Sequence, residues 1–387
     1  MSVSIVGWSH HPFGRLEEDG EAMVASVVDG ALADAGLEAR DIDMVVVGHF
    51  NGGFQQQDFP ATLAFQSQPD LRFKPATRVE NACATGSAAI HQGMNAILAG
   101  KARRVLVVGF EKMTETPGPE IGDILLKCSY VKEEAETPAG FAGVFGLLTQ
   151  SYFQRYGDQS DALAKIAAKN HLNGVDNPWA QMRKDFGFEF CNAVSEKNPL
   201  VAGPLRRTDC SLVSDGAAAL VLSVTEDALA MEKAVRFRAA EQVNDFLPMS
   251  RRDMLEMEGP ARAWAQALDQ AGLTLDDLAC VETHDCFTTA ELLEYEAMGL
   301  TPKGQGRIAI DEGWTRKDGP LPVNASGGLK AKGHPIGATG VSMHVLAAMQ
   351  ALGEAGAMQV PRSGPTAVFN MGGTAVANYV SILEPAK

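Results

Sequence analysis

The hydrophobic and polar positions of the chain alternate between amphipathic segments and short runs that are apolar throughout. Residues 22–35 carry apolar side chains at helical spacing, and Gly36 follows them as a typical residue after a helix end. Residues 44–48, Met-Val-Val-Val-Gly, form a continuous apolar run that suits a buried parallel strand. A helix followed by a buried strand is the repeating unit of an α/β protein.

The next stretch of the chain repeats this order of signals. A second helix is predicted from apolar residues at helical spacing, namely Ile90, Met94, Ile97 and Leu98. Gly100 is placed to end that helix, and residues 105–109, Val-Leu-Val-Val-Gly, predict a second strand. The chain is therefore predicted to have an α/β fold.

An internal repeat divides the chain into two similar halves. The segment Ala31–Val45 returns as Ala267–Val281, with Ala, Leu, Ala, Gly, Leu, Asp and Val in register. In the same order, the helix after Gly86 resembles the helix after Gly337. The predicted last strands also resemble one another, and lie in residues 215–222 and 372–380. Because three elements recur in order, a duplicated α/β unit is favoured over coincidence among common helices.

Residues 117–204 break this pattern with clusters of Phe, Tyr and Met and with polar turns. We expect an N-terminal half in residues 1–117 plus 205–232 and a C-terminal half in residues 233–387. The segment 118–204 is predicted to be an insertion of loops and short helices. Insertions of this size often carry function, for example as a lid over a site.

Composition and charge narrow the class of protein. Hydrophobic residues make up 45% of the 387 residues, which is ample for a large core. The formal net charge of −15 argues against general nucleic-acid binding, because phosphate contacts need positive charge. An anionic substrate such as coenzyme A would need a local basic patch, for which Arg206 and Arg207 are the candidates, although an exposed Arg pair is more often a solvated surface.

The six cysteines have no paired spacing, so we expect neither disulfides nor structural zinc. The chain starts directly with strand-like residues, lacks a run of apolar residues long enough to span a membrane, and ends without a peroxisomal signal. A cytoplasmic protein without membrane insertion is the expectation.

Cys83 is the first candidate for chemistry. It lies between a strand-like segment and a helix, among the small residues of Asn81-Ala82-Cys83-Ala84-Thr85-Gly86-Ser87. A thiol near a helix N-terminus has a lowered pKa and suits a nucleophile. A single cysteine is about as often a small buried hydrophobic residue.

Two histidine motifs are the further candidates. His334 stands between Gly333 and Pro335 on a rigid turn, and an imidazole there can activate a thiol. His284-Asp285-Cys286-Phe287 follows a predicted strand, and ligands of open α/β sheets bind at the carboxyl ends of strands. Zinc binding by His284, Cys286 and His334 is the rival interpretation, but their spacing fits no common zinc pattern.

These motifs, taken with the internal repeat, resemble the thiolase superfamily over the whole chain. The resemblance is carried by Asn81–Ser87, Ser214-Asp215-Gly216, Asn324–Gly328 and Gly333–Gly340. Most thiolases have Asn-Glu-Ala-Phe where this chain has His284–Phe287, and Cys-x-Gly where it has Asn370-Met371-Gly372. Both departures are those of the sterol-carrier-protein type of thiolase.

The resemblance implies a five-layered α-β-α-β-α thiolase fold and a set of site residues. Cys83 would be the acylated nucleophile, His334 its base, and Cys286 the thiol that protonates or deprotonates acetyl-CoA. His284 and His334 would hold one oxyanion, and the backbone N–H groups of Cys83 and Gly372 another. Ser211 and Ser326 would line the pantetheine tunnel.

The leading hypothesis is an acyl-CoA C-acyltransferase that needs neither metal nor redox cofactor and uses coenzyme A as substrate. A homodimer is implied by the resemblance, with the strand at residues 105–109 as the expected edge. Two alternatives remain open. One is a thiolase-like aldolase or condensing subunit that needs a small acyl-CoA-binding partner protein, and the other is a non-catalytic acyl-CoA or lipid carrier.

Overall fold

The computed structural model describes residues 2–387 and contains the two predicted halves. The first half contains β1 (Val3–His10), α1 (Gly20–Ala35), β2 (Met44–Gly48), α2 (Ala64–Ser67), β3 (Ala76–Val79), α3 (Thr85–Leu98), β4 (Arg104–Glu111), β7 (Gly216–Val224) and α9 (Thr225–Ala228). The second contains β8 (Val235–Asn244), α10 (Glu258–Ala271), β9 (Cys280–Glu282), α11 (Thr288–Ala297), α12 (Arg307–Asp311), α13 (Gly328–Lys332), α14 (Ile336–Leu352), β10 (Thr366–Gly372) and β11 (Ala377–Pro385).

Nine strands form one sheet in the order β3-β2-β4-β7-β1-β8-β11-β10-β9. The two halves join where β1 pairs with β8 over only two residue pairs, Ser4 with Arg236 and Ile5 with Val235. The expectation that residues 105–109 form an edge is wrong, because β4 pairs with β2 on one side and with β7 on the other. The edges of the sheet are β3 and β9.

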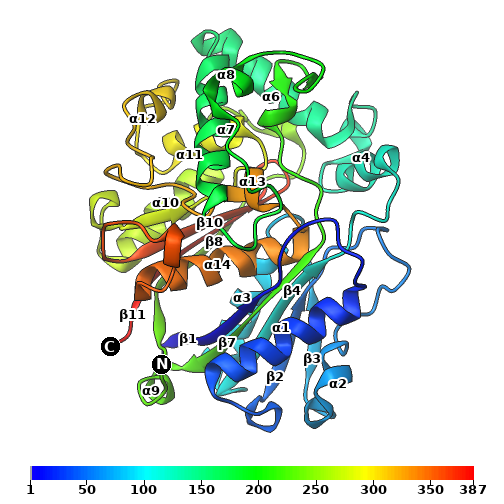
Figure 1. Ribbon diagram of the computed structural model, residues 1–387, viewed down its shortest axis with the longest axis vertical. Coiled ribbons are helices and arrows are strands. Elements are labelled where there is room, and N and C mark those ends of the chain that lie inside the picture. Colours follow the sequence, from blue (N-terminus) through cyan, green and yellow to red (C-terminus); the bar gives the residue numbers. More distant parts are fainter. Residues whose placement is uncertain (1) are drawn as a thin grey trace.

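The helices arrange the two halves of the sheet into five layers, as expected from the resemblance. α3 and α14 lie in the middle, where α14 contacts strands of both halves. α1 covers the outer face of β1 and β7, and α10 covers the outer face of β8 and β11. In Figure 1, α14 runs across the centre of the molecule between the strands of the two halves.

The duplication is visible in the way the two outer helices end. α1 ends at Gly36 and α10 at Gly272, and both glycines have a left-handed backbone with φ of 64°. A single 3₁₀ turn follows each helix, Ala39–Asp41 and Leu275–Asp277, before strands β2 and β9 begin. The repeat found in the sequence therefore corresponds to a repeated helix–turn–strand unit.

The contact between α3 and α14 depends on glycines. A Cβ on Gly86 would lie 2.6 Å from the backbone nitrogen of Val341, and a Cβ on Gly340 would lie 2.3 Å from that of Ser87. Real Cβ atoms do not approach other heavy atoms so closely, so the backbones of the two helices touch. This contact brings the N-terminal ends of both helices, and the loops before them, to one place.

Residues between β4 and β7 form the helical end of the molecule at the top of Figure 1. They contain α4 (Gly118–Leu126), α5 (Val131–Glu134), α6 (Gly140–Tyr156), α7 (Ser160–Val175), α8 (Gly187–Asn192) and the two-stranded sheet of β5 (Leu200–Ala202) and β6 (Leu205–Arg206). The prediction of mostly loops and short helices is wrong, since α6 and α7 have 17 and 16 residues. None of the helices described is long and apolar enough to cross a membrane.

Replacing Gly340 by Ala is expected to destabilise the protein by about 1–3 kcal/mol, because a methyl group has no room between α3 and α14. The measurement is urea unfolding followed by circular dichroism. Gly118→Ala is the control, because Gly118 is exposed at the start of α4 and a Cβ there meets no atom within 4 Å. Equal midpoints for the two variants would contradict the close contact of the helices.

Candidate active site

Cys83 stands on a tight turn between β3 and α3. The turn is held by Thr85, whose hydroxyl donates to the Ala82 carbonyl at 2.6 Å and accepts from the Asn81 N–H at 2.9 Å. Ala82 has a left-handed backbone with φ of 49°, an uncommon conformation for a residue other than glycine. The turn therefore fixes the direction of the Cys83 side chain at the start of α3.

Two imidazoles meet the Cys83 thiol. His284 follows β9, and His334 lies in the loop between α13 and α14. Their ring centroids are 5.1 Å apart, and the rings are nearly perpendicular at 82°. The Cys83 sulfur and one nitrogen of each ring all lie within 4.8 Å of one another. Three segments far apart in the sequence thus converge as the sequence analysis expected.

Cys128 lies beside the nucleophile and was not a sequence-based candidate. A hydrogen bond from the Cys128 thiol is the largest cause that holds the pKa of Cys83 well below the usual thiol value, and the two imidazoles add to it against the opposing effect of burial. The same contact, together with burial, raises the pKa of Cys128 well above its usual value. Cys83 is thus the thiolate of the pair and Cys128 the proton donor.

No sequence signal marks Cys128, which precedes Ser129 after the short helix α4. It reaches the site because its backbone packs against Gly373, where a Cβ would lie 2.7 Å from the Cys128 carbonyl oxygen. Only the fold could have brought it to the list of candidates.

Cys286 faces the same cavity as Cys83 and His334. Its carbonyl oxygen accepts the Ser211 N–H at 2.9 Å, which ties the second half to the loop after β6. Burial, and next the charge of Cys83, raise the pKa of Cys286 well above the usual thiol value. Cys286 is therefore a protonated thiol beside a thiolate.

The cavity at Cys83 has a volume of about 180 Å³ and a mostly apolar lining. The insertion supplies one wall through Ile121 and Leu125 of α4 and Phe141 of α6. Phe287 forms part of the opposite wall and stacks on Phe145, with centroids 4.4 Å apart. The insertion thus covers the nucleophile as a lid does.

Cys83, His284 and His334 are close enough to share a metal ion, but their hydrogen bonds do not fit one. Nδ1 of His284 lies 2.9 Å from the amide nitrogen of Asn370, which has only protons to offer. The ring proton of His284 is therefore on Nε2, the atom that a metal would need. The zinc interpretation with Cys286 fits no better, because Cys286 is not part of this close group.

Gly372 lies against the nucleophile turn, as its assignment to an oxyanion site requires, since a Cβ there would be 2.5 Å from the Asn81 carbonyl oxygen. Ser211 lines the cavity. Ser326 is buried outside the lining, and its hydroxyl donates to Glu282 at 2.5 Å.

Arg206 is not free to meet coenzyme A phosphates, which corrects the expectation from sequence. Its guanidinium is buried and ion-paired with Asp209 at 2.8 Å, and it also donates to the Ser160 carbonyl at 2.6 Å. These contacts satisfy the charge inside the protein. Arg207 is exposed and remains a candidate for the phosphates.

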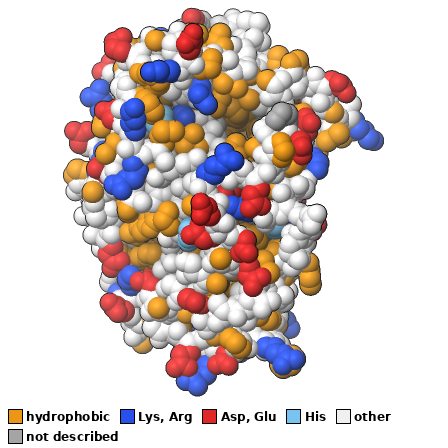
Figure 2. Space-filling model, turned by 45° about the vertical axis from the view of Figure 1, so that its right-hand side comes forward, with side chains coloured by type: hydrophobic (Ala, Val, Ile, Leu, Met, Phe, Trp, Pro, Cys, Tyr) orange, Lys and Arg blue, Asp and Glu red, His pale blue; other side chains and the backbone are white. Residues whose placement is uncertain are grey.

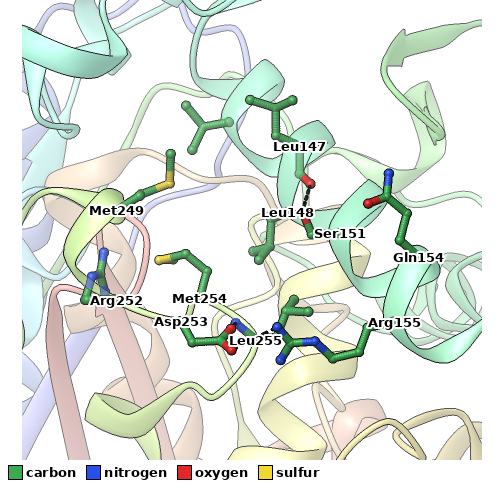
Figure 3. A pocket seen from close by; sticks show the side chains of 11 residues that line it. Leu147, Leu148, Ser151, Gln154, Arg155, Met249, Arg252, Asp253, Met254 and Leu255 are labelled. Atoms are coloured by element: carbon green, nitrogen blue, oxygen red, sulfur yellow. Dashed lines mark hydrogen bonds and ion pairs between the residues drawn. The ribbon is translucent and has the colours of Figure 1, made fainter.

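A larger cavity of about 810 Å³ lies apart from this site, between α6 and the loop around Met254 (Figure 3). Its lining includes the ion pair of Arg155 with Asp253 and no member of the cysteine and histidine group. On the face of the molecule shown in Figure 2, Lys and Arg side chains lie scattered among acidic ones. We therefore place the candidate active site at Cys83.

Known proteins share both the sequence and the fold of the chain. Residues 3–187 match the family described as "Thiolase, N-terminal domain", and residues 240–385 match "Thiolase C-terminal domain-like". An acetyl-CoA acetyltransferase of Methanothermobacter thermautotrophicus is 35% identical over 386 residues, which cover 99% of each chain. Human sterol carrier protein 2 is 33% identical over 88% of this chain, which spans 64% of that protein.

Among solved structures, the Ltp2-ChsH2(DUF35) aldolase superposes with a TM-score of 0.83 at 21% identity. The match covers 100% of this chain and 98% of that one. An identity this low shows a common fold.

Replacing Cys128 by Ala is expected to raise the pKa of Cys83 and to slow its alkylation by iodoacetamide several-fold at neutral pH, because the thiolate loses a hydrogen-bond donor. The rate of alkylation measured against pH reports the change. The matched control is Cys191→Ala, a buried cysteine in a separate cluster with Ala164 and Ala167. An unchanged pH profile for Cys128→Ala would refute the role of this thiol.

Proposed function

The chain belongs to the thiolase family, and we propose that it transfers acyl groups between coenzyme A thioesters through a thioester on Cys83. The observation that carries this proposal is the convergence of the Cys83 thiol with two imidazoles at an enclosed apolar cavity. An acyl-CoA or lipid carrier would have no use for an activated thiol. The chain is accordingly an acyltransferase.

In the cleavage direction, the Cys83 thiolate attacks the keto carbonyl carbon of a 3-oxoacyl-CoA, and His334 holds the proton that leaves the thiol. Collapse of the tetrahedral intermediate breaks the bond between the second and third acyl carbons. The acyl group stays on Cys83, and the electron pair leaves on the enolate of acetyl-CoA. The thiol of a second coenzyme A then takes up the acyl group, and Cys83 is restored.

Cys286 is the acid that protonates this enolate, and in the synthetic direction it is the base that removes the α-proton of acetyl-CoA. It lines the cavity with Cys83, and its raised pKa keeps a proton on the sulfur until a carbanion forms. Asn370 occupies the position of the cysteine that most thiolases use for this step.

The reaction places negative charge on two oxygens, and the site offers donors for each. The His284 and His334 imidazoles lie on one side of the sulfur. The Gly372 backbone packs against the nucleophile turn, and its N–H, with that of Cys83, is proposed to hold the oxygen of the tetrahedral intermediate.

The apolar walls of Ile121, Leu125 and Phe141 favour a hydrocarbon acyl group, and Ser211 and Arg207 are proposed to meet the pantetheine arm and the phosphates of coenzyme A. No metal or redox cofactor takes part in these steps. The six free cysteines suit a reducing compartment such as the cytoplasm.

A homodimer is proposed to form through β3, the free edge of the first half. Phe73, three residues before this strand, is 86% exposed and would be covered by a second copy. A partner-dependent aldolase is the alternative, because the structurally similar Ltp2-ChsH2(DUF35) protein is an aldolase by name. That activity would require a second protein chain.

Incubation with acetyl-CoA or acetoacetyl-CoA is expected to add one acyl group to the protein, measured as intact mass. Cys83→Ala is expected to give no adduct, because the nucleophile is lost. Cys280→Ala, which removes a buried thiol on β9, should be acylated like the natural protein. The absence of any adduct with short and medium 3-oxoacyl-CoA substrates would exclude the thiolase mechanism.

Cys286→Ala is expected to separate the two half-reactions. The variant should still be acylated by acetyl-CoA, because Cys83 and His334 are intact. It should exchange the α-protons of acetyl-CoA with deuterated water at least ~100-fold more slowly, as expected for loss of a positioned acid–base group. Full exchange in this variant would assign the proton transfer to another residue.

A further inference from the structure

The two imidazoles beside Cys83 have different hydrogen-bond partners at their outer nitrogens. Nδ1 of His334 lies 2.7 Å from the Thr339 hydroxyl oxygen. The single proton of that hydroxyl goes to the Pro335 carbonyl at 2.9 Å. The Thr339 oxygen must therefore accept a proton from Nδ1 of His334. This leaves a lone pair on Nε2 of the neutral ring.

The partner of His284 sets the opposite arrangement. The amide nitrogen of Asn370 lies 3.1 Å from the Cys83 carbonyl oxygen and 2.9 Å from Nδ1 of His284. A carbonyl oxygen can only accept, so the NH₂ group and not the amide oxygen must face this side. The Asn370 oxygen accepts the Ser87 hydroxyl at 2.7 Å, which agrees with this orientation. Nδ1 of His284 is thus an acceptor, and its Nε2 carries the proton.

Both Nε2 atoms are buried and, within residues 2–387, have no hydrogen-bond partner at ordinary geometry. They are the ring atoms left for the Cys83 sulfur and a bound substrate. Burial lowers the pKa of His284 to about 4, so this ring stays neutral at physiological pH. A neutral ring with a fixed Nε2 proton donates a hydrogen bond and does not compete for the thiol proton.

We propose that Thr339 and Asn370 are positioning residues that hold the two active-site imidazoles in opposite tautomers. His334 then presents a lone pair to the Cys83 thiol, and His284 presents an N–H to the oxygen of the acyl group. The inference rests on the proposed acyl transfer, because it assigns the base and the oxyanion donor of that reaction. It gives Asn370 a use in a position where most thiolases have a reactive cysteine.

The first test is nitrogen-15 NMR of histidine-labelled protein, with signals assigned by His284→Gln and His334→Gln. A Cys83→Ala background removes the thiol proton from the equilibrium. Above pH 7 we expect the proton of His334 on Nδ1 and that of His284 on Nε2. A proton on the same atom in both rings, or the reverse arrangement, would overturn the proposal.

The second test compares Thr339→Val with Thr339→Ser. Valine has no acceptor for the Nδ1 proton, so acylation of Cys83 is expected to slow by about 10-fold or more. Serine keeps the hydroxyl, and its acylation rate is expected to stay within about threefold of the natural protein. Equal losses in both variants would assign Thr339 a packing role and refute the proposal.

Ser381→Ala is the matched control for these variants. It removes a buried hydroxyl that contacts Nε2 of His344 at 2.9 Å, away from the site, and should leave acylation unchanged. Circular dichroism establishes that each variant is folded, and the NMR measurement with Thr339 and Asn370 intact stands if Thr339→Val is not.

For the second positioning residue, Asn370→Asp replaces the amide donor by an acceptor at Nδ1 of His284. We expect the His284 proton to appear on Nδ1 and the pKa of the ring to rise. An unchanged His284 spectrum would refute the role of Asn370.

The two proposals fail separately. If the natural protein forms no acyl adduct but shows the opposite tautomers, the transfer reaction is wrong and the hydrogen-bond assignment stands. If it is acylated and the tautomers are the same, the reaction stands and the assignment is wrong.

Discussion

The contact between α3 and α14 is the constraint on which the rest of the structure depends. A Cβ at Gly86 or Gly340 would overlap the backbone of the facing helix, so the two halves can approach only because these positions lack side chains. The loops that precede the two helices then meet. One loop carries Cys83 and the other carries His334, so a packing requirement in the core creates the catalytic arrangement.

Buried carboxylates hold these loops in place. Glu111, at the end of β4, accepts N–H groups of Phe50 and Asn51 and, across the halves, that of Gly337 at the start of α14. Asp215 accepts the Lys112 ammonium and the Thr114 hydroxyl. Buried charges of this kind persist when hydrogen bonds satisfy them, and they fix one arrangement of the backbone. The thiol and imidazoles therefore sit on a rigid frame.

Local patterns carried much of the fold and part of the site. The apolar run at residues 44–48 became β2, and Gly36 ended α1, because burial and backbone conformation depend on nearby residues. The same patterns did not reveal that β4 lies inside the sheet, because an apolar run does not name its neighbours. The pairing of Arg206 with Asp209 had a local signal in their spacing of three residues, which composition alone outweighed.

The sequence by itself determined the chemistry present: Cys83, His284, Cys286 and His334 stand in short motifs whose meaning does not depend on distant residues. The tertiary structure decided how these groups are tuned. Cys128 reaches the nucleophile, and Asn370 reaches His284, only because segments far apart in the chain fold together. Proton positions and thiol pKa values depend on distances of a few ångströms through space, and no linear pattern records those distances.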